Sequence, residues 1–274
     1  MNRLTSQYLD HNGMTTAYYD EGEGPVFLLL HGFTGSKLDF HNQLGWFADR
    51  HRVIAPDNRG HGESTNSGDD VDYILDNLAN DLHSFIETMG LENIHLLGHS
   101  MGGMVVMRYA LAHPEKLASL ILMDTLSTSL KMPQNMIDGM SQALNNGALE
   151  NIMKMMRNAP ASPEVQNGID FLGETEHWAR IEEKLNQMDP VAYRSIGTQF
   201  GELPDITESL AGINCPTTVI VGEADTPFLK SSHAMAETIK GAELKIIKNA
   251  AHSPQYENPT AWRAVISEHL QRYT

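Results

Sequence analysis

The residues best suited to chemistry lie at positions 98–102 (GHSMG), directly after a short apolar run at 94–97. The pattern places glycine two residues before and two residues after Ser100, and a helix-like segment follows at once. A strand-to-helix turn this tight would press side chains at 98 and 102 against neighbouring backbone, and glycine removes that conflict. The turn would expose the Ser100 hydroxyl at the carboxyl edge of a sheet, so we predict that Ser100 is a nucleophile.

A serine hydroxyl is a weak nucleophile at its ordinary pKa, so it needs a general base whose tautomer is fixed by a carboxylate. Two later apolar runs are followed by such groups, Asp225 after the first and His252 after the second. We predict that His252 takes the proton of Ser100 and that Asp225 orients His252. Glu223, nearer the end of its run, and Asp124 compete for the role of the acid.

Backbone N–H groups beside the nucleophile would bind the anion that forms on a substrate carbonyl. Residues 31–35 (HGFTG) follow the apolar run 26–30, and Met101 follows the predicted nucleophile. We assign the N–H groups of Phe33 and Met101 to this oxyanion hole, where one donor typically contributes about 10²–10³ in turnover.

These residues require a sheet whose strand ends meet at one edge. Short apolar runs at 26–30, 53–55, 94–97, 120–123, 218–221 and 244–247 alternate with predicted helices at 73–89, 101–112, 231–239 and 259–271. This alternation predicts an α/β fold with a doubly wound, mostly parallel sheet. Asn12 and Gly13 predict a hairpin at the sheet edge, and Asn258 and Pro259 predict the start of the last helix.

The segment 127–211 interrupts the alternation, because it carries helix-like stretches such as 136–144 and 152–157 but no convincing strand. We interpret it as a helical cap inserted into an α/β core formed by residues 1–126 and 212–274. Its methionines favour ordinary packing at helical spacing, although flexible thioethers also suit a compliant wall for an acyl chain. The candidate substrate-binding residues in the cap are Met136, Met140, Phe171 and Trp178, and Arg157, Arg180 and Arg194 are candidates for holding a carboxylate.

The chain resembles the α/β-hydrolase fold family over almost its whole length. The resemblance rests on motifs in family order, which are residues 31–33 (HGF), 57–64 (DNRGHGES), 98–103, 222–225 and His252. It implies a hydrolase that acts on an ester, a thioester, a lactone or an activated C–C bond, without a metal, flavin or nucleotide cofactor. It also implies that His31, Asp57, Arg59 and His61 hold loops through hydrogen bonds, and that His99 is a packing or hydrogen-bonding neighbour of the nucleophile.

Charge and composition exclude several other classes of function. The 19 basic and 35 acidic side chains leave a net charge of −16, which disfavours binding to nucleic acid or anionic membranes. No apolar run reaches the roughly 18–20 residues of a membrane span, and no signal peptide is recognisable, so we expect a cytoplasmic protein. The single cysteine and the absence of zinc-type histidine spacing argue against a disulfide or a metal site.

The favoured function is therefore that of a carboxylesterase or lactonase that forms an acyl-enzyme on Ser100, acts on a small molecule, and exists as a monomer or homodimer. Two alternatives stay open. One is a C–C hydrolase of the meta-cleavage-product type, and the other is a signalling receptor that keeps the triad to sense a ligand under the cap. Sustained turnover of a simple ester separates the favoured function from the receptor.

Overall fold

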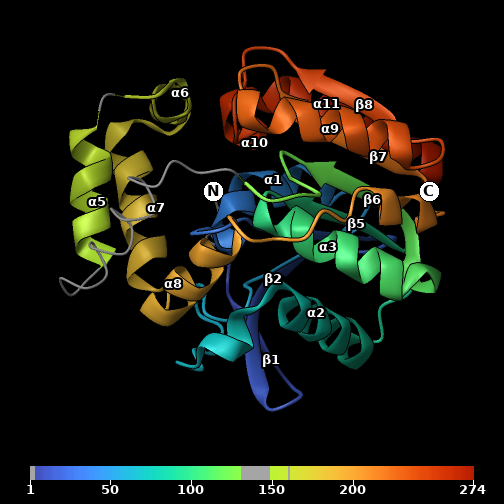
Figure 1. Ribbon diagram of the computed structural model, residues 1–274, viewed down its shortest axis with the longest axis horizontal. Coiled ribbons are helices and arrows are strands. Elements are labelled where there is room, and N and C mark those ends of the chain that lie inside the picture. The colour runs from blue at the N-terminus through green and yellow to red at the C-terminus, as the bar shows by residue number, and fades with distance from the viewer. Residues whose placement is uncertain (1–3, 131–148, 160) are drawn as a thin grey trace.

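The computed structural model describes residues 4–130, 149–159 and 161–274, and its centre is an eight-stranded sheet (Figure 1). The strand order is β1-β2-β4-β3-β5-β6-β7-β8. The strands are β1 (Gln7–His11), β2 (Met14–Glu21), β3 (Val26–Leu30), β4 (Arg52–Pro56), β5 (Ile94–His99), β6 (Leu117–Met123), β7 (Thr217–Gly222) and β8 (Glu243–Ile247). Only the pairings β1–β2 and β2–β4 are antiparallel, so the predicted mostly parallel sheet is confirmed.

Helices cover both faces of the sheet, which explains why the central strands are apolar on both sides. Leu28 and Leu30 of β3 pack with α2 (Leu75–Met89), α3 (Met101–Ala112) and α9 (Thr226–Thr238). Phe27 and Leu29 point to the opposite face and pack with the remaining core helices. Those helices are α1 (His41–Phe47) and α11 (Pro259–Tyr273). Successive strand residues alternate between the two faces, so a strand buried on both must be continuously apolar.

The N-terminal hairpin lies at the sheet edge, as predicted. Asn12 and Gly13 connect β1 to β2 with φ values of 45° and 76°. Positive φ at both central residues matches the twist of the flanking strands, and asparagine and glycine tolerate it best.

The helix starts were predicted with mixed accuracy. Asn258 caps α11, because its side chain accepts the N–H of Ala261 at 3.2 Å. In contrast, α9 begins at Thr226, five residues before the predicted start at Ser231. Pro227 lies in the first turn of α9, a position where proline is compatible with a helix because its missing N–H has no partner to lose.

Within residues 149–159 and 161–211, the chain between β6 and β7 forms four α-helices and no strand. We call them the inserted helices: α5 (Leu149–Asn158), α6 (Pro163–Leu172), α7 (Glu174–Asn186) and α8 (Pro190–Gln199). They gather to one side of the sheet in Figure 1. The predicted helix at 152–157 lies within α5, and the one at 136–144 lies outside the described residues.

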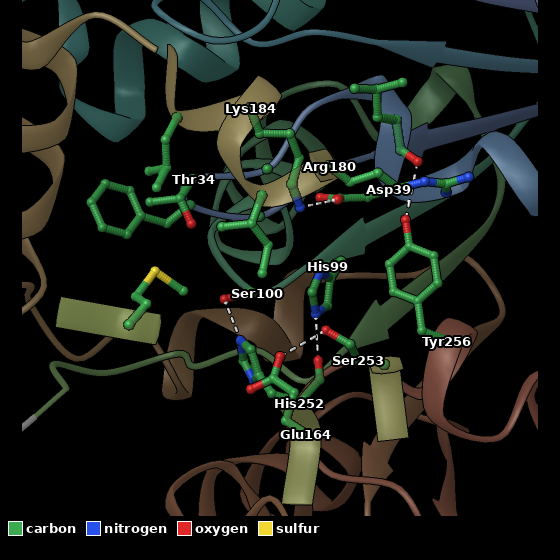
Figure 2. A pocket seen from close by; sticks show the side chains of 18 of the residues that line it. Thr34, Asp39, His99, Ser100, Glu164, Arg180, Lys184, His252, Ser253 and Tyr256 are labelled. Carbon is green, nitrogen blue, oxygen red and sulfur yellow. Dashed lines mark hydrogen bonds and ion pairs between the residues drawn. The ribbon is translucent and has the colours of Figure 1, made fainter. Parts of the chain in front are cut away.

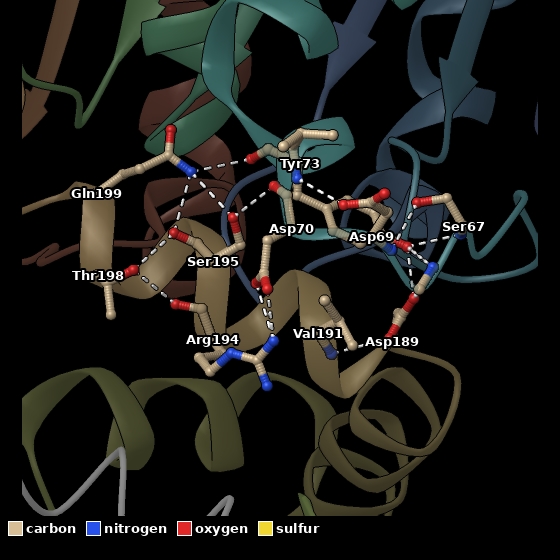
Figure 3. Close-up of polar contacts among 12 residues, drawn as sticks. Ser67, Asp69, Asp70, Tyr73, Asp189, Val191, Arg194, Ser195, Thr198 and Gln199 are labelled. Atoms are coloured by element: carbon tan, nitrogen blue, oxygen red, sulfur yellow. Dashed lines mark hydrogen bonds and ion pairs between the residues drawn. The ribbon is translucent and has the colours of Figure 1, made fainter.

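Helix α8 attaches the inserted helices to the core (Figure 3). Arg194 forms an ion pair with Asp70 at 2.8 Å, and the Ser195 hydroxyl donates to the Asp70 carbonyl at 2.9 Å. The Tyr73 hydroxyl donates to the carboxylate of Asp189, the residue that caps α8. These contacts fix one end of the insertion to the segment that precedes α2.

Candidate active site

Ser100 occupies a strained turn between β5 and α3, with φ of 53° and ψ of −118°. Its N–H donates to the carbonyl of Met123 at 2.9 Å, so the turn is tied to the end of the neighbouring strand β6. A Cβ atom at Gly98 would lie 2.5 Å from the carbonyl oxygen of Gly102, and one at Gly102 would lie 2.4 Å from that of Leu30. The spacing of the two glycines is therefore a direct consequence of backbone packing, as the sequence indicated.

The structure brings Ser100, His252 and Asp225 together. His252 Nδ1 lies 2.8 Å from Asp225 Oδ2, where an imidazole N–H can donate to a carboxylate. With that tautomer the lone pair of Nε2 faces Ser100 Oγ at 2.9 Å. Both distances are those of good hydrogen bonds, and the order nucleophile, base and acid is the one that proton transfer requires. Figure 2 shows the contact between Ser100 and His252.

The pKa of His252 lies above the ordinary value of 6.5 because two opposing effects do not cancel. Burial lowers it, and the hydrogen bond and charge of Asp225, with the charges of Glu164 and Glu257, raise it by more. The surroundings of His252 thus stabilise its imidazolium form more than water stabilises that of a free imidazole.

The two rival acids are placed differently from Asp225. Glu223 is exposed, and its carboxylate accepts the N–H of Asn249 at 3.4 Å. Asp124 is fully buried, and burial and the charge of Asp225 raise its pKa well above the ordinary value. Burial thus disfavours the charged form of Asp124 that would stabilise an imidazolium, and Asp225 is the carboxylate in contact with His252, which makes Asp225 the better-placed acid.

A group of possible metal ligands also falls here. Within the described part of the chain, Asp124, Asp225 and His252 have ligand atoms within 4.8 Å of one another. Nδ1 of His252 is already engaged with Asp225, and the carboxylate of Asp124 accepts the Gly222 N–H at 2.8 Å. One ligand atom of each of these three residues thus already takes part in a hydrogen bond within the protein.

The loop after β3 lies beside the nucleophile. A Cβ atom at Gly32 would lie 3.0 Å from the Cβ of Ser100, and the next residue, Phe33, lines the pocket in front of it. Met101 begins α3, so its backbone N–H is at the free N-terminal end of that helix. The placement suits both residues to an oxyanion hole, and that role stays a prediction.

His31 and its neighbours hold these loops through buried hydrogen bonds, as predicted. His31 Nε2 accepts the Asn58 N–H at 2.9 Å, and burial lowers the pKa of His31 to about 4, which keeps this acceptor neutral. The Lys37 ammonium pairs with Asp57 at 2.6 Å. Arg59 forms an ion pair with Asp81 at 2.6 Å. His61 Nδ1 donates to the Arg59 carbonyl at 3.0 Å.

His99 also acts as a hydrogen-bonding neighbour, as predicted. Its Nε2 donates to the backbone carbonyl of His252 at 2.7 Å. Burial, together with the charge of His252, lowers the pKa of His99 to about 4, so the ring stays neutral near pH 7. His99 thus supports the position of His252 rather than duplicating its chemistry.

A cavity of about 510 Å³ opens above Ser100, between the core and the inserted helices. Its wall is mainly apolar and includes Phe33, Leu130, Ile152, Met156, Phe200 and Phe228. The lining also includes charged side chains, namely Asp39, Glu164, Arg180, Lys184 and Glu257. Figure 2 shows Arg180, Lys184 and Asp39 gathered on one side, with Glu164 near His252.

The predicted cap residues meet this cavity only in part. Met136 and Met140 lie outside the described residues. Phe171 and Trp178 are described, but they are not among the residues that line the pocket. Their helix neighbours do line it, because one residue turns a helix by about 100°. The lining residues that sequence reasoning missed on these two helices include Leu172, His177 and Ile181.

Of the three cap arginines, Arg180 lines the cavity and the other two do not. Arg157 lies over the ring of Trp178, and Arg194 belongs to the attachment of α8. Lys184, one turn after Arg180, pairs with the buried Asp39 of the core at 2.6 Å. No sequence pattern indicated Lys184 or Asp39.

In the described part of the chain, no helix combines the length and apolarity that crossing a bilayer requires.

Comparison with known proteins gives a consistent result. The family profile described as alpha/beta hydrolase fold matches residues 25–146. The non-heme chloroperoxidase CPO-A1 of Kitasatospora aureofaciens is 28% identical, over 88% of this chain and 90% of its own. The bifunctional esterase/perhydrolase DCH of Acinetobacter calcoaceticus is also 28% identical, over 85% of this chain and 87% of its own.

Among solved structures, the enol-lactonase from Burkholderia xenovorans LB400 superimposes with a TM-score of 0.83. The two chains are 20% identical, and the match covers 97% of this chain and all of the other. At that identity the likeness concerns the fold alone. It extends over the inserted helices as well as the sheet, since nearly the whole chain is covered.

Proposed function

The chain belongs to the α/β-hydrolase fold family, and on that premise we propose that it is a serine hydrolase that cleaves a carboxylic ester or lactone through an acyl-enzyme. The observation that carries the proposal is the pair of contacts from His252, 2.9 Å to Ser100 Oγ and 2.8 Å to Asp225 Oδ2. They lie at the base of a largely apolar cavity. This arrangement supports nucleophilic catalysis by Ser100.

In the first half of the reaction, Ser100 Oγ attacks the substrate carbonyl while His252 Nε2 takes the hydroxyl proton. The carbonyl oxygen becomes an anion, which the backbone N–H groups of Phe33 and Met101 bind. Asp225 stabilises the imidazolium that has formed. His252 then gives its proton to the leaving alkoxide, the alcohol departs, and an acyl group remains on Ser100.

In the second half, water replaces the alcohol. His252 takes a proton from the water as its oxygen attacks the acyl carbonyl, and the same N–H groups bind the second oxyanion. Collapse of this intermediate breaks the bond to Ser100 Oγ, which recovers its proton from His252. For a lactone the alcohol stays attached to the acid, so a single hydroxy acid leaves.

The apolar part of the cavity suits a short or medium acyl chain. Phe33 and Phe200 approach each other edge to face, with ring centroids 5.2 Å apart, and Met156 from α5 contributes a flexible thioether. We propose that residues 127–211 act as the cap that supplies Met156 and Phe200 to this wall, on a core formed by residues 1–126 and 212–274, which supplies Phe33.

The test is steady-state hydrolysis of p-nitrophenyl esters from acetate to octanoate, with Ser100→Ala beside the parent protein. Continuous turnover that the variant loses supports the proposal and ranks the acyl lengths. Hydrolysis that persists in Ser100→Ala contradicts it.

The same experiment addresses the two alternatives. A burst of one product per chain without turnover would instead favour a ligand-sensing receptor, since an acyl group would then remain on Ser100. No reaction with any ester would favour a C–C hydrolase with a narrow substrate.

A further inference from the structure

The short loop that carries His252 is held firmly by the core. Glu257, on the short helix α10 (Pro254–Glu257), accepts hydrogen bonds from two backbone N–H groups of this loop. Its Oε2 accepts the N–H of Ala251 at 2.8 Å, and its Oε1 accepts that of Ser253 at 2.7 Å. Both residues that flank His252 are therefore tied to one carboxylate.

Helix α6, one of the inserted helices, contacts the same loop and the Glu257 carboxylate. Glu164 Oε1 accepts the Ser253 hydroxyl at 3.0 Å, and Asn167 Nδ2 donates to Glu257 Oε2 at 2.8 Å. Glu164 and Asn167 are three residues apart, so they project from one face of the helix. Figure 2 shows Glu164 beside His252 and Ser253. The insertion thus contacts the residue next to the proposed base.

Several ionisable groups surround the His252 imidazole, each from a different element. Asp225 at the start of α9 orients it directly, and the neutral His99 at the end of β5 lies with its ring centroid 5.1 Å away. The others that bear on it are Glu257 of α10, which is engaged with backbone amides, Asp124, which is buried behind Asp225, and Glu164. Of these carboxyl groups, Glu164 is the one that the insertion supplies.

We propose that Glu164 is a positioning residue for His252, which holds the 251–253 loop through the Ser253 hydroxyl and places a negative charge where the imidazolium forms. The inference rests on the proposed serine hydrolase mechanism. It makes helix α6 part of the machinery that sets the basicity of His252, in addition to forming a wall of the cavity. The raised pKa of His252, to which the charge of Glu164 contributes after that of Asp225, agrees with this role.

The variant Glu164→Gln isolates the charge, because glutamine keeps the size of the side chain and an oxygen that accepts the Ser253 hydroxyl. The acid limb of kcat/KM against pH reports the base of the free enzyme. We expect this limb to move to lower pH by on the order of half a unit, the scale of one nearby charge partly screened by protein and water. Gln166→Ala, an exposed position on the same helix that contacts Asp170, serves as the control and should leave the limb in place.

A purely structural role would lower kcat or stability without moving the limb. A Glu164→Gln profile that coincides with that of the parent protein would therefore overturn the proposal. An equal shift in Gln166→Ala would also overturn it, because the effect would then come from helix α6 as a whole.

NMR titration of the His252 ring supplies a readout that needs no turnover. The signal is assigned by its loss in His252→Gln, and its pKa should fall in Glu164→Gln and stay unchanged in Gln166→Ala. If esters are hydrolysed in a Ser100-dependent way but this pKa does not fall, the role of Glu164 fails alone. If the pKa falls but no ester is turned over, the proposed function fails and the effect of Glu164 on the imidazole stands.

Discussion

The two walls of the cavity differ in how their functional groups are held. On the core wall, backbone geometry places Ser100, His252 and Asp225 at the ends of parallel strands, where buried hydrogen bonds fix the loops. On the wall formed by the inserted helices, side chains form the surface of the cavity, and the Met156 side chain is 38% exposed. Under the proposed function, the chemistry would depend on a backbone with little freedom, and the selection of substrate would depend on side chains that can be exchanged.

If this contrast is correct, the largest difference in kcat between two variants should come from replacing the two core acids, Asp225 and Asp124. Asp225→Asn should lower kcat by about 10³–10⁴-fold, because asparagine neither fixes the working tautomer of His252 nor stabilises its charge. Asp124→Asn should cost less than about tenfold, since asparagine keeps the size of the side chain and an oxygen that can still accept the Gly222 N–H. Single-turnover and steady-state rates check this, and equal losses in both variants would count against the assignment of Asp225.

As the pH is lowered, the protein should lose its activity before it unfolds. Activity requires neutral His252, whose pKa is raised, so kcat/KM should rise with pH through a midpoint above 6.5 and fall about tenfold per unit below it. His31, His61 and His99 have pKa values lowered by burial, to about 4, 3 and 4. Their contribution to stability is complete above about 6.5, the value in the unfolded chain, and is lost as pH falls toward about 4.

Urea unfolding and kcat/KM measured across the same pH series check the order of these two losses. Unfolding that begins at or above the midpoint of the activity profile would contradict it.

Backbone packing under the nucleophile predicts a large loss of stability from a single methyl group. Gly98→Ala should lower the free energy of unfolding by at least about 2 kcal/mol, because its Cβ would meet backbone at 2.5 Å. Gly45→Ala is the matched control, since a Cβ there meets nothing within 4 Å and the residue lies in helix α1. Alanine at 45 should stabilise by about 0.5–1 kcal/mol. Urea denaturation of the two variants distinguishes close packing from a general effect of replacing glycine.

The ion pair between Lys184 and Asp39 joins the two walls of the cavity. Breaking it should lower the free energy of unfolding by an amount comparable to, or smaller than, that expected for Gly98→Ala. Lys184→Met should destabilise by about 2–3 kcal/mol, because it leaves the buried carboxylate of Asp39 without its partner. Adding Asp39→Asn should recover part of this loss. Arg194→Met, which breaks a pair whose side chains are about half exposed, should cost about 0–1 kcal/mol. Similar costs for Lys184 and Arg194 would mean that burial does not strengthen the contact at the cavity.

Local patterns carried most of the information about the core wall. The glycines around Ser100, the apolar runs that became β3 to β8, and the Asn12–Gly13 turn are readable because their constraints act between residues close in sequence. Chain order alone also nominated Asp225 and His252, since each follows a late strand. It favoured Asp225 over Asp124 as the acid, although both follow strands, and it is burial and the contact to His252 that separate the two in the structure.

The inserted helices show where such reasoning ends. Periodicity placed helical structure around 152–157, but it carried no information on how each helix is rotated about its axis against the sheet. Leu172 rather than Phe171 therefore faces the cavity, and the contact of Glu164 with Ser253 joins positions 89 residues apart. The sequence by itself determined the fold class and the tight turn at Ser100, because strand alternation and a strained turn are local requirements. Only the tertiary structure decided which carboxylate contacts His252 and which helix faces line the cavity, since those depend on distances between segments that no local pattern encodes.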